Sequence, residues 1–141
     1  MPELDAFVAG IGTGGTITGV GEVLAQEKPG TLVVAVEPRD SPLLTQGKAG
    51  PHKLQGLGAN FVPSILNRAA FERIADVGYE EALAMARRLA REEALLSGLS
   101  TGAIVHAAVE LARELGAGKT VVAVLCDTGE RYLSHPLYAE G

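Results

Sequence analysis

The most constraining feature of this sequence is a glycine-rich run, residues 8–19, that follows a short apolar segment. The apolar residues 6–9 predict a buried strand, and the amphipathic pattern after the run predicts a helix over residues 15–26. Glycine lets the backbone adopt positive φ and approach a ligand closely. The first N–H groups of a helix lack internal partners and attract anions. Together with the hydroxyls of Thr13 and Thr16, this arrangement predicts a phosphate-binding turn.

Two kinds of phosphate ligand fit this turn. Gly10, Gly12 and Gly15 have the spacing of a dinucleotide-binding fingerprint, and Glu37 follows the next apolar run, where a ribose-binding carboxylate would lie. The additional glycine at position 14 and the flanking hydroxyls instead favour a single terminal phosphate monoester. A tight turn with no ligand is the third possibility, although glycine at this density is costly in chain entropy.

The composition limits the class of protein. The 141 residues fit one α/β domain spanning residues 1–141, and 47% hydrophobic residues permit a true core. A net charge of −5 argues against nucleic acid or an anionic membrane as partner. The one cysteine, Cys126, allows no intrachain disulfide and favours a reducing compartment. With no apolar run of transmembrane length, we expect a cytoplasmic protein, and we predict no metal site.

Strand and helix signals alternate along the chain, which predicts an open parallel sheet with flanking helices. Strands are expected at residues 6–9, 31–36, 73–77 and 120–126, and helices at residues 15–26, 79–95 and 103–115. The last strand is apolar throughout, so it is predicted to be central in the sheet. Residues 38–67 form a long loop rich in glycine and proline, which is uncommon in a compact domain unless it is functional.

Three turns are expected to meet at one edge of this sheet, because ligands of open parallel sheets bind outside the carboxyl ends of the strands. They are the glycine turn, a second glycine and hydroxyl turn at residues 97–102, and residues 127–131 after the last strand. In the second turn, the Ser100 hydroxyl could hydrogen-bond a ring nitrogen without forcing its protonation. Position alone favours a helix N-cap role for Ser100 or Thr101.

Five motifs, in this order, resemble those of cysteine synthase (O-acetylserine sulfhydrylase), a family of the tryptophan-synthase-β-like pyridoxal-phosphate (PLP) enzymes. They lie at residues 10–16, 36–38, 51–59, 98–103 and 127–134 and cover nearly the whole chain. The His-Lys-x-Gln-Gly-x-Gly stretch at residues 52–58 favours cysteine synthase over cystathionine β-synthase or threonine dehydratase relatives. The resemblance implies the larger, PLP-binding domain of the fold-type II enzymes, here incomplete.

The resemblance also implies roles for particular residues around PLP and a small amino-acid substrate. The residues implied to grip the PLP phosphate are Gly12, Thr13, Gly14, Gly15 and Thr16. Ser100 would face the pyridine nitrogen, and Glu37 would not bind a ribose. The residues implied to border the substrate are Gln55, Gly56 and Gly58. The family's reaction is loss of acetate from O-acetylserine followed by addition of sulfide to give cysteine, carried out by homodimers.

The resemblance begins near the middle of the family's sequence, so the half that carries the Schiff-base lysine is expected to be missing. The four lysines, Lys28, Lys48, Lys53 and Lys119, lie outside that lysine's motif. We therefore assign no catalytic residue and expect the chain alone to be inactive and to bind PLP weakly and noncovalently, or not at all. Cys126 stands where relatives usually have proline, and its place after an apolar strand predicts an inert, buried thiol.

Three functions of different classes remain open from the sequence. The first is the C-terminal portion of a cysteine synthase that works only with a complementing N-terminal half. The second is a non-catalytic PLP- or phosphate-binding module, or a partner of a full-length enzyme. The third is a Rossmann-type nucleotide binder. For the first two, uncovered sheet edges and apolar faces predict a homo-oligomer or association with the complementing half.

Overall fold

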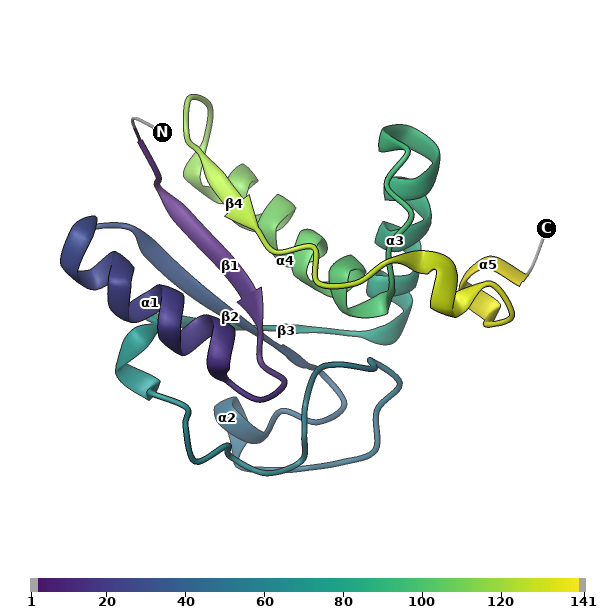
Figure 1. Cartoon of the computed structure of the whole chain (residues 1–141), viewed down its shortest axis with the longest axis horizontal. Coiled ribbons are helices and arrows are strands. Elements are labelled where there is room, and N and C mark those ends of the chain that lie inside the picture. Colours follow the sequence, from purple (N-terminus) through teal and green to yellow (C-terminus); the bar gives the residue numbers. More distant parts are fainter. Residues whose placement is uncertain (1–2, 140–141) are drawn as a thin grey trace.

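The alternating strand and helix signals fold as predicted, into a four-stranded parallel sheet with helices on both faces (Figure 1). The structure is a computed structural model, and residues 3–139 are described here. The order across the sheet is β3-β2-β1-β4. The strands are β1 (Ala6–Gly10), β2 (Leu32–Pro38), β3 (Arg73–Val77) and β4 (Val121–Ala123).

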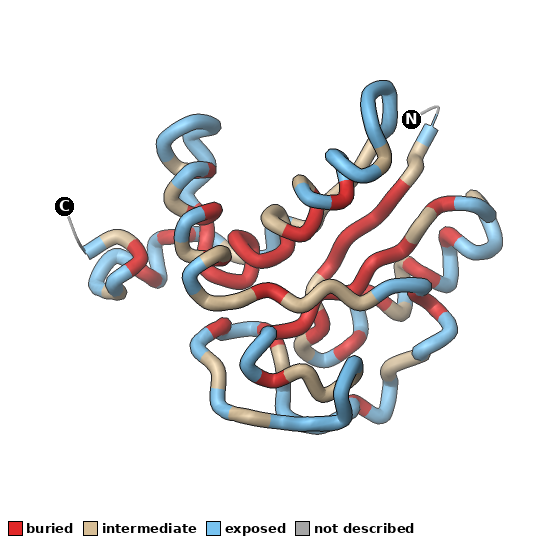
Figure 2. The backbone as a smooth tube through the Cα atoms, turned by 180° about the vertical axis from the view of Figure 1, so that it is seen from behind, coloured by how far each residue is buried: buried red, intermediate tan, exposed pale blue. Residues whose placement is uncertain are grey.

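The helices divide between the two faces of the sheet. Helix α1 (Gly15–Glu27) packs on one face, and α3 (Tyr79–Glu93) and α4 (Leu99–Leu115) pack on the other. Each face has its own apolar cluster, and Figure 2 shows the buried positions concentrated along the strands and on α4. The remaining elements are short: α2 (Leu43–Gln46), η1 (Arg68–Ala70), η2 (Gly129–Tyr132) and α5 (Pro136–Ala139).

Strand β1 is the centre of the sheet and fixes where a ligand can bind. Val8 pairs with Val34 of β2 on one side and with Ala123 of β4 on the other. The chain passes from β1 to β2 in one direction, whereas β4 adds on the opposite side of β1. The carboxyl ends of β1 and β4 therefore flank a topological switch point, the place where open α/β sheets bind ligands.

The prediction of a long, central last strand is wrong. Strand β4 has three residues and, in the described part of the chain, pairs with β1 alone at an edge of the sheet. Its apolar character has another cause, because both of its faces are covered. Val121 and Ala123 pack against the apolar cluster on the face that α3 and α4 cover. Val122 and Val124 pack against the cluster on the face that α1 covers.

Helix α4 begins four residues earlier than the predicted start at residue 103. Its N-cap is Gly98, so the prediction that Ser100 or Thr101 is the N-cap is wrong. The helix approaches α3 closely, because a Cβ added at Gly102 would lie 2.1 Å from the carbonyl oxygen of Ala82. Glycine at this position therefore sets the spacing of the two helices that cover one face of the sheet.

The predicted loop at residues 38–67 contains one short helix, α2, and lies near the carboxyl end of β1 (Figure 1). In residues 3–139, none of the helices combines the length and the apolar character that a membrane crossing requires.

Candidate functional site

A cleft of about 720 Å³ opens at the carboxyl ends of β1 and β4. The whole glycine turn, residues 12–16, forms one wall. Val124 and Cys126 line the cleft where the chain leaves β4. The long loop contributes a second wall, made of Gly56, Leu57, Ala59, Phe61, Pro63, Ser64 and Ile65. Segments far apart in the sequence thus meet at the predicted edge of the sheet.

The glycine turn has the geometry of an anion site at a helix start. Gly14 is the N-cap of α1 with φ of 88°, a left-handed conformation that favours glycine. The N-cap has no side chain, and the first N–H groups of α1 have no intrahelical acceptor; the Gly15 N–H donates to the Thr13 hydroxyl at 3.4 Å. Thr13 and Thr16 are exposed beside them. The turn therefore combines backbone N–H groups, two hydroxyls and the positive end of a helix dipole.

The long loop at residues 38–67 packs directly against this turn. The Gly58 N–H donates to the Ile11 carbonyl oxygen at 3.0 Å, and a Cβ added at Gly12 would lie 2.5 Å from the Gly56 carbonyl oxygen. Gly56 lines the cleft. Gly58 lies behind it, where its carbonyl oxygen is 2.7 Å from His52 Nε2. Gln55 is exposed and does not line the cleft, although it neighbours Gly56.

Ser100 lies in the first turn of α4 with 2% of its surface exposed. Its hydroxyl is 3.1 Å from Cys126 Sγ and would lie 3.6 Å from a Cβ added at Gly56. Both of those neighbours line the cleft, whereas Ser100 itself does not; its hydroxyl lies directly behind Cys126 and Gly56.

The prediction that Cys126 is a buried thiol is wrong, because the residue is exposed and lines the cleft. The apolar strand ends three residues earlier, at Ala123, and the backbone beyond it turns toward α4. The position of Cys126 immediately after a strand, at the carboxyl edge of a parallel sheet, is the sequence signal that could have placed it in the site.

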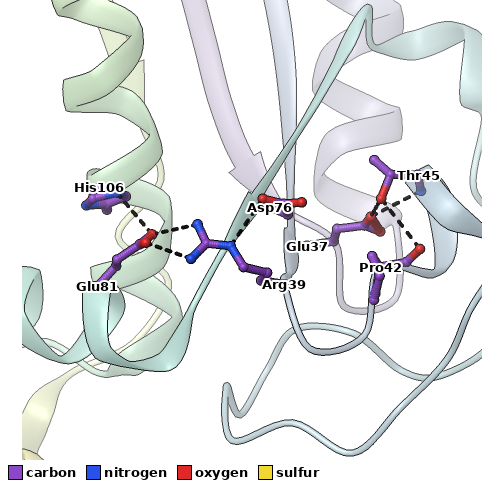
Figure 3. A network of polar contacts seen from close by, with 7 residues as sticks. All are labelled: Glu37, Arg39, Pro42, Thr45, Asp76, Glu81 and His106. Atoms are coloured by element: carbon purple, nitrogen blue, oxygen red, sulfur yellow. Dashed lines mark hydrogen bonds and ion pairs between the residues drawn. The ribbon is translucent and has the colours of Figure 1, made fainter.

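The Glu37 carboxylate is hydrogen-bonded to α2. Its carboxylate is buried and accepts hydrogen bonds from the Thr45 backbone N–H (3.1 Å) and hydroxyl (2.6 Å) (Figure 3). It also accepts one from the Leu44 backbone N–H at 3.0 Å. These bonds fix the start of α2. Since the carboxylate faces α2 and does not line the cleft, a ribose-binding role has no support in the geometry.

A separate ion-pair network ties the end of β2 to the helices. Arg39 makes two hydrogen bonds to Glu81, at 2.7 and 3.0 Å, and approaches Asp76 at 3.5 Å (Figure 3). His106 Nε2 lies 3.3 Å from the same Glu81 carboxylate. The Arg39 hydrogen bonds lower the pKa of Glu81 below its ordinary value. These side chains are paired with one another and lie outside the cleft.

None of the four lysines, all within the described residues, lines the cleft. Lys53 lies over the Tyr79 ring, 5.2 Å from its centroid, and Lys119 pairs with Asp5 at 3.5 Å. Lys28 follows the end of α1, and Lys48 lies in the exposed part of the long loop. No lysine of this chain is therefore placed to bond covalently to a ligand in the cleft.

The fold and the anion site define a cofactor-binding α/β domain, and comparison with known proteins supplies its family. The family model described as "Pyridoxal-phosphate dependent enzyme" matches residues 1–127, so the chain belongs to that PLP-dependent family. Within the family it is similar to cysteine synthase from Staphylococcus aureus, with 56% identity over 136 residues, which are 96% of this chain and 44% of the relative. The resemblance found in the sequence motifs is thereby confirmed.

Solved structures agree. O-ureido-L-serine synthase superposes with a TM-score of 0.94 at 43% identity, covering 98% of this chain and 44% of that one. Cysteine synthase (OASS) from Entamoeba histolytica superposes with a TM-score of 0.94 at 37% identity, covering 99% and 41%. The predicted fold-type II architecture is therefore confirmed, and the chain spans less than half the length of these relatives, matching their C-terminal part.

Proposed function

We propose that this chain forms the cofactor-holding half of a cysteine synthase active site. PLP occupies the cleft with its phosphate on the glycine turn and its ring beside Ser100. The observation that carries the proposal is that the glycine turn at the start of α1 lines the cleft, and that the Ser100 hydroxyl lies directly behind Cys126, which lines the same cleft.

The residues present fit a phosphate monoester. A dianionic phosphate needs several donors and a positive potential, and the start of α1 offers both, together with the Thr13 and Thr16 hydroxyls. A side chain at Gly12 would collide with the backbone of the facing loop, so glycine there keeps the cradle open and the loop close. A dinucleotide fits less well, because the Glu37 carboxylate that would bind its ribose is hydrogen-bonded to α2.

The ring side of the cleft fits a pyridine. The Ser100 hydroxyl is neutral, so it can hydrogen-bond the ring nitrogen without requiring a full positive charge there. When bound, PLP supplies the electron sink that allows an amino acid to lose a group from its β-carbon. Of the three loop residues implied to border the substrate, Gly56 lines the cleft, whereas Gln55 and Gly58 adjoin it without lining the wall.

We further propose that the complete enzyme makes cysteine from O-acetylserine and sulfide, and that this chain alone does not. The 56% identity to a cysteine synthase supports the reaction. The absence of any lysine from the cleft wall in residues 3–139 supports the proposal that the chain alone does not catalyse it. The PLP-binding lysine would come from a complementing N-terminal half, because a homo-oligomer of this chain brings no lysine to the cleft wall. The single free cysteine supports a reducing compartment, the cytoplasm.

The alternative is a non-catalytic PLP- or phosphate-binding module that partners a full-length enzyme. The same observation favours it, since a cradle without a lysine can bind the cofactor and do nothing further. Mixing this chain with an N-terminal half distinguishes the enzyme half from the non-catalytic module.

The test mixes this chain with the separately produced N-terminal part of the Staphylococcus aureus cysteine synthase and measures cysteine formation from O-acetylserine and sulfide. We expect no product from either part alone and turnover from the mixture. The control mixture carries alanine in place of the N-terminal part's PLP-binding lysine and should be inactive. Turnover by this chain alone contradicts the proposal, and a stable but inactive complex that still binds PLP favours the non-catalytic module.

A further inference from the structure

Asp127 reaches from the end of β4 to the N-terminus of α4. Its Oδ1 accepts a hydrogen bond from the Gly98 backbone N–H at 3.0 Å and another from the Thr101 hydroxyl at 3.1 Å. Its Oδ2 accepts one from the Tyr132 hydroxyl at 3.1 Å. The N-cap residue of α4, Gly98, has no side chain to serve the helix start. Asp127 therefore places an acceptor and a negative charge where a helix favours them.

The space that the Asp127 carboxylate occupies exists because residue 98 is a glycine. A Cβ added at Gly98 would lie 2.1 Å from Asp127 Oδ2 and 2.5 Å from the ring of Tyr132. Only glycine leaves room for the carboxylate at this point. Two of the three donors to Asp127 belong to the start of α4 and the third to η2, so this residue, which follows β4, joins all three segments.

The same contact fixes the neighbours of Ser100. The Thr101 side chain is fully buried, and its hydroxyl donates to Asp127 while it accepts from the Cys126 backbone N–H at 3.2 Å. Thr101 is thus held from both sides. The hydroxyl of Ser100, one residue earlier, lies 3.1 Å from the Sγ of Cys126, and Cys126 lines the cleft.

We propose that Asp127 is a positioning residue for Ser100. It holds the first turn of α4 so that the Ser100 hydroxyl meets the ring nitrogen of PLP. Asp127 does not itself line the cleft, so it acts through α4 and not by touching the cofactor. This role rests on the proposed function, which places the PLP ring beside Ser100.

The test compares two ligands that share the phosphate. Titration calorimetry of the full chain gives dissociation constants for PLP and for inorganic phosphate. In Asp127→Asn, Oδ1 still accepts from Gly98 and Thr101, but the negative charge at the start of α4 is lost and the NH₂ group must donate to the Tyr132 hydroxyl instead of accepting from it. Because charge-assisted hydrogen bonds become neutral ones, we expect the dissociation constant for PLP to rise roughly tenfold. Inorganic phosphate contacts only the glycine turn, so its constant should stay within about twofold of wild type.

A matched pair at Thr101 provides the control and a second route if Asp127→Asn does not fold. Thr101→Ser keeps the hydroxyl and should bind PLP like wild type. Thr101→Val keeps the volume, loses the hydroxyl and should weaken PLP but spare phosphate.

Equal losses for both ligands mean general damage to the fold and overturn the positioning role. Unchanged PLP affinity in Asp127→Asn and Thr101→Val overturns that role while the proposed function stands. A wild-type chain that binds phosphate but not PLP overturns the proposed function itself, and the role of Asp127 with it.

Discussion

Gly12 and Gly56 face each other so closely that a Cβ on Gly12 would lie 2.5 Å from the Gly56 carbonyl oxygen. The contact joins the glycine turn to the long loop that forms another wall of the cleft. Neither backbone can retreat easily, because the Gly58 N–H is bonded to the Ile11 carbonyl oxygen next to Gly12.

Gly12→Ala should therefore separate the two walls of the cleft. We expect the free energy of unfolding to fall by about 1–3 kcal/mol, as in other overpacked sites, and PLP affinity to fall with it. Gly19 is the matched control, since a Cβ there meets nothing within 4 Å and the residue lies inside α1. Gly19→Ala should raise the free energy of unfolding by roughly 0.5–1 kcal/mol and leave PLP binding unchanged. Urea denaturation and calorimetry of both variants check this, and equal PLP affinity in the two would count against the contact.

Cys126 offers a chemical report on the cleft. It is the chain's one thiol, it is exposed, and it lies beside Ser100 where the PLP ring is proposed to bind. Bound PLP should slow its alkylation by iodoacetamide in proportion to the fraction of clefts occupied, whereas NAD should not. Intact mass against time gives the rate directly. An alkylation rate indifferent to PLP, at concentrations that raise the melting temperature, would place the ring elsewhere.

Tyr132 should make stability depend on pH in the alkaline range. Burial, and then the Asp127 negative charge that its hydroxyl faces, raise the pKa of Tyr132 to about 12. The folded state therefore holds this proton more tightly than the unfolded state, where a tyrosine titrates near about 10. The resulting stability is complete below pH of about 10 and is lost as pH rises toward 12.

The comparison with Tyr132→Phe isolates this effect from other groups. At pH of about 8, the variant should be less stable by about 0.5–1.5 kcal/mol, the value of one hydrogen bond. The difference from wild type should shrink as pH rises above about 10. Urea denaturation across this range measures it, and a difference that stays constant would argue against the Tyr132–Asp127 bond.

Local patterns predicted the parts of the site that one short segment builds. The glycine turn, β1 and α1 follow one another within about twenty residues, so strand, turn and helix signals are all readable there. The strand at residues 73–77 was likewise predicted with its observed bounds. These elements depend on hydrophobic periodicity and on glycine, both of which a sequence displays.

The features that the sequence did not predict depend on contacts between residues far apart in the chain. The early start of α4 relies on Asp127, 29 residues beyond Gly98, which accepts the hydrogen bond that a local N-cap side chain would have taken. The edge position of β4 and the exposure of Cys126 depend on which segments cover them, and an apolar run gives the same signal in either case. Two of the mistaken predictions, about the N-cap and the thiol, concern residues that contact each other, Ser100 and Cys126.

The first measurement is to add PLP to the purified chain, record its melting temperature, then reduce with borohydride and take an intact mass, with pyridoxal as the phosphate-free control. A working cradle without a cleft lysine predicts that PLP raises the melting temperature, that pyridoxal does not, and that reduction leaves no stoichiometric pyridoxyl adduct. A full adduct on one lysine, formed with PLP but not with pyridoxal, would contradict this, because it would show a cofactor-binding lysine within the chain itself.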